Sequence, residues 1–426
     1  MLVLGLAVGR FVLADSEAGP DYPIPALDQS LATEIARLEQ RTAAQPDDLL
    51  AWQQLGVLYT RRAVQVGDPA FYDVAGSAFD KADGVVRDDP ATLLGRGNLA
   101  LSLHDFSEAL DYGERAFAAL PRSADALGVI VDAEVELGRY AAAAEHLQRM
   151  LDTRPGLPAL ARASYLRELH GDLPGAVIAM RQADAAGAGA SFDHATVVAL
   201  LGDLYWKQGE LAAARVAYER ADGLAAGIVP ASVGRARVLA ARGERAQAIS
   251  LLSQVVDRYP QPAAVILLGE LQAAGGRAQD AAKTFALVRT IATLARQAGQ
   301  VTDLEMALFE ADHGDPRQAV ELARAAHEAR PDNIFANDAL AWALRKDGRA
   351  GEAIGYAERA LRLGTADALL RYHAAEIFAA AGQPDRARDE LRRAFDLNPW
   401  FSTFHAADAI ALADRLGVMA PEGPRR

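Results

Sequence analysis

The sequence predicts an all-α fold, and three observations carry that prediction. Alanine-rich helical patterns run through nearly the whole chain of 426 residues, while β-branched alternation is scarce. One glycine recurs between two helical patterns at spacings of 33 to 38 residues, and an alanine follows each of these glycines five residues later. A period of this length is typical of repeat proteins, whose units stack into one solenoid instead of forming separate globular domains.

The predicted unit is a helical hairpin with a glycine at its turn. Glycine adopts the left-handed conformation that ends the first helix at little steric cost. The small alanine lets the two helices approach closely, and a large residue four positions later fills the space between hairpins. Proline then stops the second helix. The glycines are Gly138, Gly171, Gly209, Gly243, Gly276, Gly314, Gly348 and Gly382. The alanines are Ala109, Ala143, Ala176, Ala214, Ala248, Ala281, Ala319, Ala353 and Ala387.

Several units carry a fuller signature. The first opens with Trp52, Leu55, Gly56 and Tyr59, and the central one contains Leu201, Gly202, Tyr205, Ala214, Tyr218 and Ala221. This pattern resembles the tetratricopeptide repeat (TPR) family. The resemblance covers about ten hairpins between residues 47 and 399. It implies a right-handed superhelix, in which the first helix of each hairpin lines a concave groove that takes peptides or partner helices.

Three segments depart from the regular period. The first unit carries the insertion RRAVQVGDPAFYDVAGSAF at residues 61–79. Two gaps of 38 residues place extra residues near 186–192 and 291–299. We expect these insertions to lengthen helices or the loops between them.

The ends of the chain differ from the repeats. Residues 1–14 are apolar and end in Val12-Leu13-Ala14, which is typical of a signal-peptidase site, although a buried first helix would also fit. Residues 15–30 are predicted to form a Pro-containing linker, 31–399 the solenoid, 400–420 a C-terminal capping helix and 421–426 a tail. We therefore expect an exported protein or one tethered to the membrane through its N-terminus, with a cytoplasmic location as the alternative.

Composition and motifs argue against several function classes. The formal net charge of −13 disfavours nucleic-acid binding, which depends on basic side chains. The chain has no cysteine, and its eight histidines show no metal-ligand spacing. GRGNLA at residues 95–100 matches a dinucleotide fingerprint, but no strand is predicted before it. We expect no catalytic residue, cofactor or metal, and hence no enzyme.

The expected activity is the binding of a partner protein or peptide by a scaffold. An alternative is an accessory subunit, or a maturation or assembly factor, of an envelope transport or enzyme complex. Helix phase predicts the side chains that face the groove: Asn98, Asp132, Asp203, Trp206, Arg237, Glu270, Trp342, Arg345, Tyr372 and Glu376. Trp206 and Trp342 are either exposed anchors for a partner or packing residues between hairpins.

Overall fold

The computed structural model describes residues 27–187, 189 and 191–421, and within these residues it contains helices and no strands. The N-terminal segment 1–14, predicted as a signal or anchor, lies outside them. None of the described helices combines the length and the apolarity that crossing a bilayer requires. The 22 helices are α2 (Leu27–Ala44), α3 (Leu49–Val66), α4 (Ala70–Val85), α5 (Pro90–Leu103), α6 (Phe106–Ala119), α7 (Ala124–Glu136), α8 (Tyr140–Thr153), α9 (Leu157–Leu169), α10 (Leu173–Ala186), α11 (Phe192–Lys207), α12 (Leu211–Leu224), α13 (Val229–Ala241), α14 (Arg245–Arg258), α15 (Pro262–Ala274), α16 (Ala278–Gln297), α17 (Asp303–His313), α18 (Pro316–Ala329), α19 (Ile334–Lys346), α20 (Ala350–Ala360), α21 (Ala368–Ala380), α22 (Pro384–Leu397) and α23 (Ala406–Leu416).

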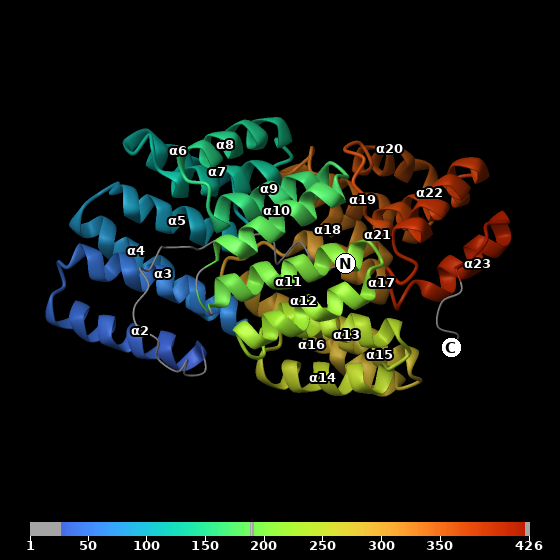
Figure 1. The fold of residues 1–426 in the computed structure, drawn as a ribbon, viewed down its shortest axis with the longest axis horizontal. Helices are drawn as coiled ribbons and strands as arrows, with labels where there is room; N and C mark the ends of the chain where they lie inside the picture. The colour runs from blue at the N-terminus through green and yellow to red at the C-terminus, as the bar shows by residue number, and fades with distance from the viewer. Residues whose placement is uncertain (1–26, 188, 190, 422–426) are drawn as a thin grey trace.

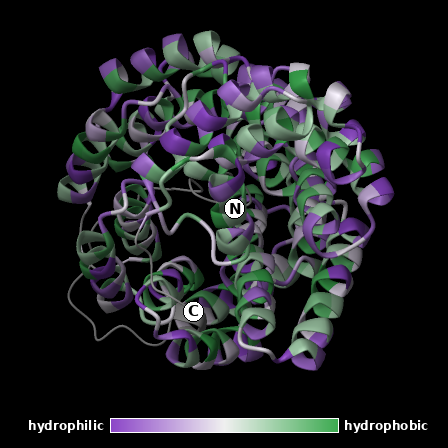
Figure 2. Ribbon diagram, turned by 90° about the vertical axis from the view of Figure 1, so that its right-hand side faces the viewer, coloured by the Kyte–Doolittle hydropathy of each residue, from purple (hydrophilic) through white to green (hydrophobic). Residues whose placement is uncertain are grey.

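These helices form ten consecutive antiparallel hairpins, from α3–α4 to α21–α22, with α2 before the first and α23 after the last. Each hairpin packs on the next, so the stack follows a superhelical path (Figure 1). Viewed along the superhelix axis, the helices form a ring (Figure 2). The predicted α-solenoid of about ten hairpins is confirmed.

The recurring alanines and glycines have the packing roles that the sequence indicates. The nine alanines of the series are all buried, with exposed fractions of 0 to 3%. Seven of the eight turn glycines have a positive φ. Gly314 is the exception, because its φ is −144°. Its lack of a side chain serves close packing instead, since a Cβ there would lie 1.6 Å from Oε2 of Glu310.

Large side chains of the second helices fill the space above the glycines of the first helices. A Cβ on Gly202 would lie 2.5 Å from the Tyr218 ring, and a Cβ on Gly234 of the next hairpin 2.2 Å from the same ring. Phe79 lies in the same way against Gly56 and Gly95. Gly95, the first glycine of the GRGNLA motif, is therefore a packing residue within a helix.

The three insertions mainly lengthen helices. In the first hairpin α3 has 18 residues and α4 has 16, whereas most second helices have 14. The insertion near residue 190 precedes a 16-residue α11, and the insertion near residue 295 extends α16 to 20 residues.

Successive turns of the superhelix touch each other. Five polar side chains from the second turn each donate a hydrogen bond to a carbonyl in the last turn of a first helix 192 to 198 residues earlier. The pairs are Gln261 with Val64, Gln300 with Ser102, Asn333 with Glu136, Thr365 with Leu169 and Asn398 with Trp206, at 2.5 to 3.1 Å. Carbonyls at a helix C-terminus have no partner within the helix, so these donors satisfy them.

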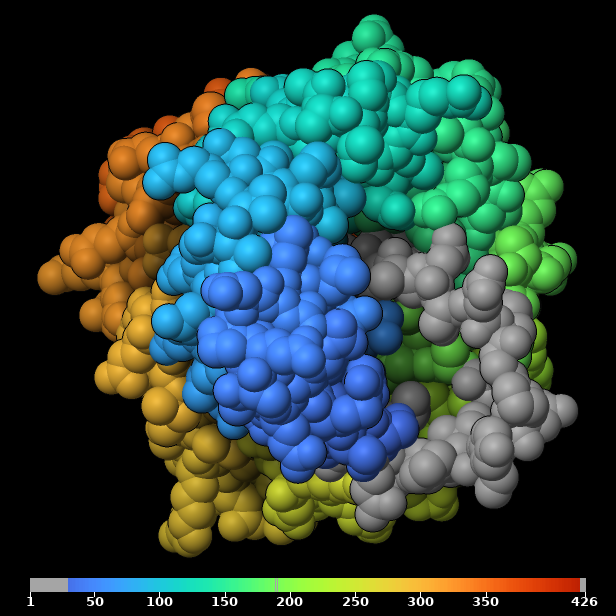
Figure 3. Space-filling view, turned by 90° about the vertical axis from the view of Figure 1, so that its left-hand side faces the viewer, coloured from blue at the N-terminus to red at the C-terminus, as the bar shows by residue number. Residues whose placement is uncertain are grey.

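We call this row of hydrogen bonds the seam. Because it joins hairpin one to hairpin seven and hairpin four to hairpin ten, one turn of the superhelix spans six hairpins. Ion pairs reinforce it: Arg330 lies 3.1 Å from buried Glu136, and Lys207 lies 2.7 Å from Asp367. Figure 3 shows the N-terminal helices, in blue, against the gold helices of the second turn. Successive turns of the superhelix are therefore held in contact along the seam, and we call such a superhelix closed.

Candidate functional site

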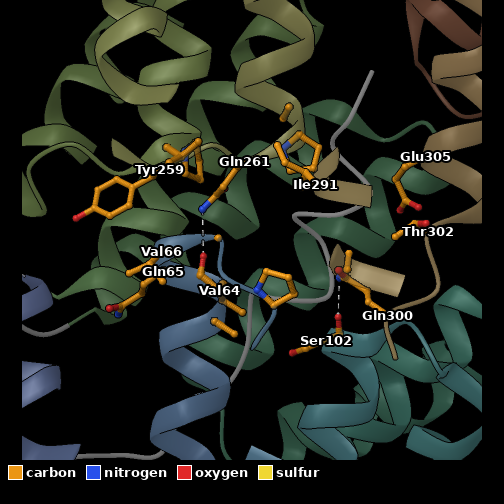
Figure 4. A pocket seen from close by; sticks show the side chains of 18 of the residues that line it. Val64, Gln65, Val66, Ser102, Tyr259, Gln261, Ile291, Gln300, Thr302 and Glu305 are labelled. Atoms are coloured by element: carbon orange, nitrogen blue, oxygen red, sulfur yellow. Dashed lines mark hydrogen bonds between the residues drawn. The ribbon is translucent and has the colours of Figure 1, made fainter. Parts of the chain in front are cut away.

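A pocket of about 220 Å³, here called the channel pocket, lies between the two turns. Its wall is formed by the ends of α3 and α5, the starts of α4, α11, α13, α15 and α17, and the second half of α16. Figure 4 shows that two bonds of the seam, from Gln261 to Val64 and from Gln300 to Ser102, border it. The pocket therefore depends on contact between residues that lie nearly 200 positions apart.

All three insertions contribute to this pocket. The first insertion supplies Ala63, Val64, Gln65, Val66, Gly67, Pro69 and Tyr72. The second supplies Phe192, and the third supplies Ile291, Ala292 and Ala295. Segments that are about 100 residues or more apart in the sequence thus meet at one place because the superhelix closes there.

The lining of the channel pocket is mainly apolar. Ile266, Val288 and Met306 add to the aliphatic surface that the third insertion provides. Thr302 and Glu305 lie side by side at one end of the pocket (Figure 4). An apolar cavity with a few polar groups is typical of a binding site, in which burial gives affinity and the polar groups orient the ligand.

The interior of the second turn is built differently, because the chain itself fills it. Segment 400–405, between α22 and α23, passes over the first helices there. The Phe401 ring lies 5.3 Å from the Tyr372 ring, and the Phe404 ring lies 4.5 Å from the His313 ring. His405 lies at a right angle to Trp342, with ring centroids 5.5 Å apart. We call the region formed by segment 400–405 and the side chains of His313, Trp342 and Tyr372 the filled groove.

Asp312 is the polar centre of the filled groove. Its carboxylate accepts a hydrogen bond from the Trp342 indole N–H at 2.9 Å and lies 3.3 Å from Nε2 of His405. Burial alone would raise the pKa of Asp312, but the imidazole of His405, with smaller effects from His373 and Lys346, holds that pKa well below its usual range.

A second buried pair lies beside Asp312. Nδ1 of His373 lies 3.0 Å from the Asp338 carboxylate, and the His373 ring stacks on Trp342 at 4.1 Å. Burial raises the pKa of Asp338, although His373 opposes that shift. Aromatic stacking and paired charges together close this part of the interior.

The ten residues predicted to face the groove all lie on first helices of hairpins, but they form more than one group. Trp206, Arg237 and Glu270 line a smaller cavity of about 70 Å³ that segment 400–405 borders. Trp342 and Tyr372 are buried under that segment, with exposed fractions of 3% and 1%, and Arg345 pairs with Glu376 at 2.7 Å. Asp203 accepts a hydrogen bond from Tyr218, Asp132 pairs with Arg162, and the Asn98 amide donates to the Leu94 carbonyl.

None of these ten residues is among the described residues that line the channel pocket. The only signal in the sequence was the set of insertions, which were visible as breaks in the period. Among the described residues, no group of three or more His, Cys, Asp or Glu side chains could hold a metal ion.

The stacked hairpins define an α-solenoid repeat protein. Sequence models described as tetratricopeptide repeat match residues 94–158, 195–227 and 233–297. These matches identify the three matched segments as tetratricopeptide repeats, and the ten hairpins carry the recurring glycines and alanines on both sides of them. Proteins of this kind generally act as interaction scaffolds without catalytic activity.

Several solved structures are similar to the chain. TTC0263, a thermophilic TPR protein of Thermus thermophilus, is 24% identical, with 42% of this chain and 96% of that chain covered and a TM-score of 0.38. Yeast Tom70 is 13% identical, with 92% and 96% covered and a TM-score of 0.37. Human IFIT1, solved as a dimer with PPP-AAAA, is 12% identical, with 87% and 88% covered and a TM-score of 0.48. No curated protein matches the sequence.

Proposed function

We propose that the protein is a non-catalytic scaffold that holds a segment of a partner polypeptide in the channel pocket. The observation that carries this proposal is the convergence of all three insertions on one apolar cavity. The inserted residues are not needed for the stacking of hairpins. Here the three insertions supply eleven of the residues that line the pocket. The filled groove already holds segment 400–405, so the channel pocket is the better place for a partner.

The partner is proposed to be a protein or peptide rather than a nucleic acid. No lysine or arginine is among the described residues that line the channel pocket, and a phosphate backbone needs such side chains for affinity. An apolar wall instead suits aliphatic or aromatic side chains, whose burial contributes roughly 25 cal/mol per Å².

Placing a charge in the pocket tests this proposal. In an Ile291→Glu variant we expect partner affinity to fall roughly tenfold or more, because a buried unpaired carboxylate is costly. Ile178→Glu is the matched control, since Ile178 is 59% exposed on α10. Partners captured from host extract by the wild type and the two variants would be compared by quantitative mass spectrometry. The purified partner would then be titrated by calorimetry.

Equal capture by the Ile291→Glu and Ile178→Glu variants would contradict the proposal. The number and identity of the captured proteins also distinguish two versions of the proposed function. Several client proteins indicate a general scaffold, whereas one stoichiometric partner indicates an accessory subunit or assembly factor of a larger complex. Export or membrane tethering stays a prediction, which fractionation of host cells would test.

A further inference from the structure

One end of the channel pocket carries an acid beside a hydroxyl, and this chemistry narrows the kind of partner. Other polar side chains of the lining, such as Gln65 and Gln261, lie elsewhere in the pocket. The opposite walls are aliphatic, with Val288 and Ile291 of α16 on one side and Val66 of the first hairpin on another. The polar end is formed by Thr302 and Glu305 at the start of α17. A ligand that fills this pocket can therefore place apolar groups on these walls and bring a polar group to Thr302 and Glu305.

The Thr302 hydroxyl is buried without a hydrogen-bond partner. Thr302 is 9% exposed, and its Oγ1 has no donor or acceptor within reach among the described residues. Most buried hydroxyls in proteins are paired, so an unpaired one at a pocket wall indicates a ligand group or a water that belongs there. A hydroxyl can donate or accept, and Glu305 beside it determines which partner suits both groups.

The Glu305 side chain is mostly buried, with 17% of its surface exposed. Nδ1 of the His104 imidazole lies 3.7 Å from the Glu305 carboxylate. That distance is too long for a hydrogen bond, and the same nitrogen lies 2.9 Å from the Val301 carbonyl, to which its N–H donates. Because this N–H is directed to Val301, it does not hydrogen-bond the Glu305 carboxylate.

Charged groups of both signs lie near this end of the pocket. Burial raises the pKa of Asp303, and the charge of Glu305 adds to that shift, although Arg296 and Arg330 oppose it. A carboxylate in a mainly apolar pocket is costly without a counter-charge, so a cation on the ligand would be stabilised here.

We infer that the channel pocket binds a lysine of the partner flanked by aliphatic residues, with its ammonium pairing with Glu305 and donating a hydrogen bond to Thr302. This inference rests on the proposed function. The four methylenes of a lysine stem pack on apolar walls while the charged end reaches a polar site. An ammonium is a compact charge with three donors, which suits a single carboxylate beside a hydroxyl, whereas arginine needs room for a planar fork.

A series of pentapeptides tests the inference on the full chain. The probes are Ac-Ala-Ile-Xaa-Ile-Ala-amide with lysine, norleucine or glutamate as Xaa, and the norleucine peptide without its acetyl group. We expect the lysine peptide to bind roughly tenfold more tightly than the norleucine peptide, because a charge-assisted hydrogen bond is worth about that factor. The glutamate peptide should bind more weakly than both. Dissociation constants would be measured by NMR titration.

Two variants test whether Glu305 and Thr302 cause the preference for the lysine peptide. Glu305→Gln should reduce the preference for lysine over norleucine to within about twofold, and Thr302→Val should reduce it by a smaller factor. Glu321→Gln is the control for loss of one negative charge, since Glu321 is exposed on α18 outside the pocket. Norleucine-peptide affinity should stay the same in all three variants.

The outcomes separate the inference from the proposed function. Equal binding of the lysine and norleucine peptides would overturn the inference and leave an apolar partner site. Tighter binding of the unacetylated peptide would overturn it in favour of a free amino terminus. If no peptide binds to the folded wild type, both the inference and the proposed function are overturned.

Discussion

The two halves of the interior are built from the same kind of hairpin, but one half contains an open cavity and the other is filled by the chain itself. Around the channel pocket, three insertions lengthen the repeats and leave an apolar cavity. In the filled groove the repeats are regular, and segment 400–405 packs its aromatic rings on Trp342, Tyr372 and His313. The comparison teaches that repeat length, rather than the residues of the repeat signature, determines where this superhelix keeps space for a partner.

Both halves contain buried polar groups, and some of these lack a hydrogen-bond partner among the described residues. In the filled groove, Asp312 is paired with His405 and bonded to Trp342. In the channel pocket, the Thr302 hydroxyl has no partner among the described residues. In the filled groove, Nε2 of His373, Nδ1 of His405 and Oγ1 of Thr403 likewise lack a partner among the described residues. An unpaired atom alone therefore does not distinguish the two halves, whereas the larger apolar cavity beside Thr302 does.

The largest expected effect concerns Trp342. Replacing it with alanine should reduce the free energy of unfolding by about 3–5 kcal/mol, because a buried aromatic ring is lost and Asp312 loses a donor. Ile291→Ala in the channel pocket should cost only about 1 kcal/mol, since Ile291 is partly exposed. Urea denaturation of both variants measures the difference.

The same variant tests the sequence-based alternative for Trp342. If Trp342→Ala keeps nearly full stability but loses partner binding, the residue is an exposed anchor and segment 400–405 does not cover it in solution. The same comparison applies to Trp206, which is 8% exposed beside the smaller cavity.

A smaller effect is expected from filling space with one larger side chain. Ala375→Leu in the filled groove should destabilise the fold by about 1–3 kcal/mol, because Ala375 is 0% exposed in a packed core. Ala292→Leu should cost less than about 1 kcal/mol, since Ala292 lines the channel pocket and the added carbons can enter it. Thermal unfolding would show equal losses if the pocket were closed.

An effect that varies with pH is expected in the seam that both halves share. Burial would raise the pKa of Asp367, but the Lys207 ammonium at 2.7 Å lowers it to about 2. A carboxyl with a lowered folded pKa stabilises the fold above its unfolded pKa, near 4, and this contribution is lost as the pH falls through the folded value. Asparagine at 367 can still cap α21, which Asp367 does by accepting from Leu369 N–H.

We therefore expect the Asp367→Asn variant to show a shallower loss of stability than the wild type between about pH 4 and pH 2. Urea denaturation at a series of pH values measures the slopes. Identical slopes would mean that Lys207 and Asp367 do not form an ion pair in solution.

The repeat register could be predicted from sequence because each unit depends on local contacts. The alanine series and the turn glycines mark where helices touch and end, and only Gly314 differs in its backbone conformation. The seam could not be predicted in this way. It joins residues 192 to 198 positions apart, and their distance depends on small rotations summed over six hairpins.

The same reason limited the prediction of the site. Helix phase placed Trp342 and Tyr372 on first helices correctly, but it could not show that segment 400–405 returns to cover them. The insertions near residues 65, 190 and 295 were visible, whereas their meeting at one pocket follows only from closure of the superhelix.

The central claim is that the two turns touch and thereby form the channel pocket. The amide of Val301 tests it most directly, because its N–H donates to the Leu103 carbonyl of the other turn at 2.9 Å, although its own side chain is 42% exposed. We predict that hydrogen exchange of this amide, followed by NMR, is slowed on the order of a hundredfold or more relative to an unprotected amide. Exchange of the Val301 amide at the unprotected rate in the folded protein would contradict a closed superhelix and the pocket that depends on it.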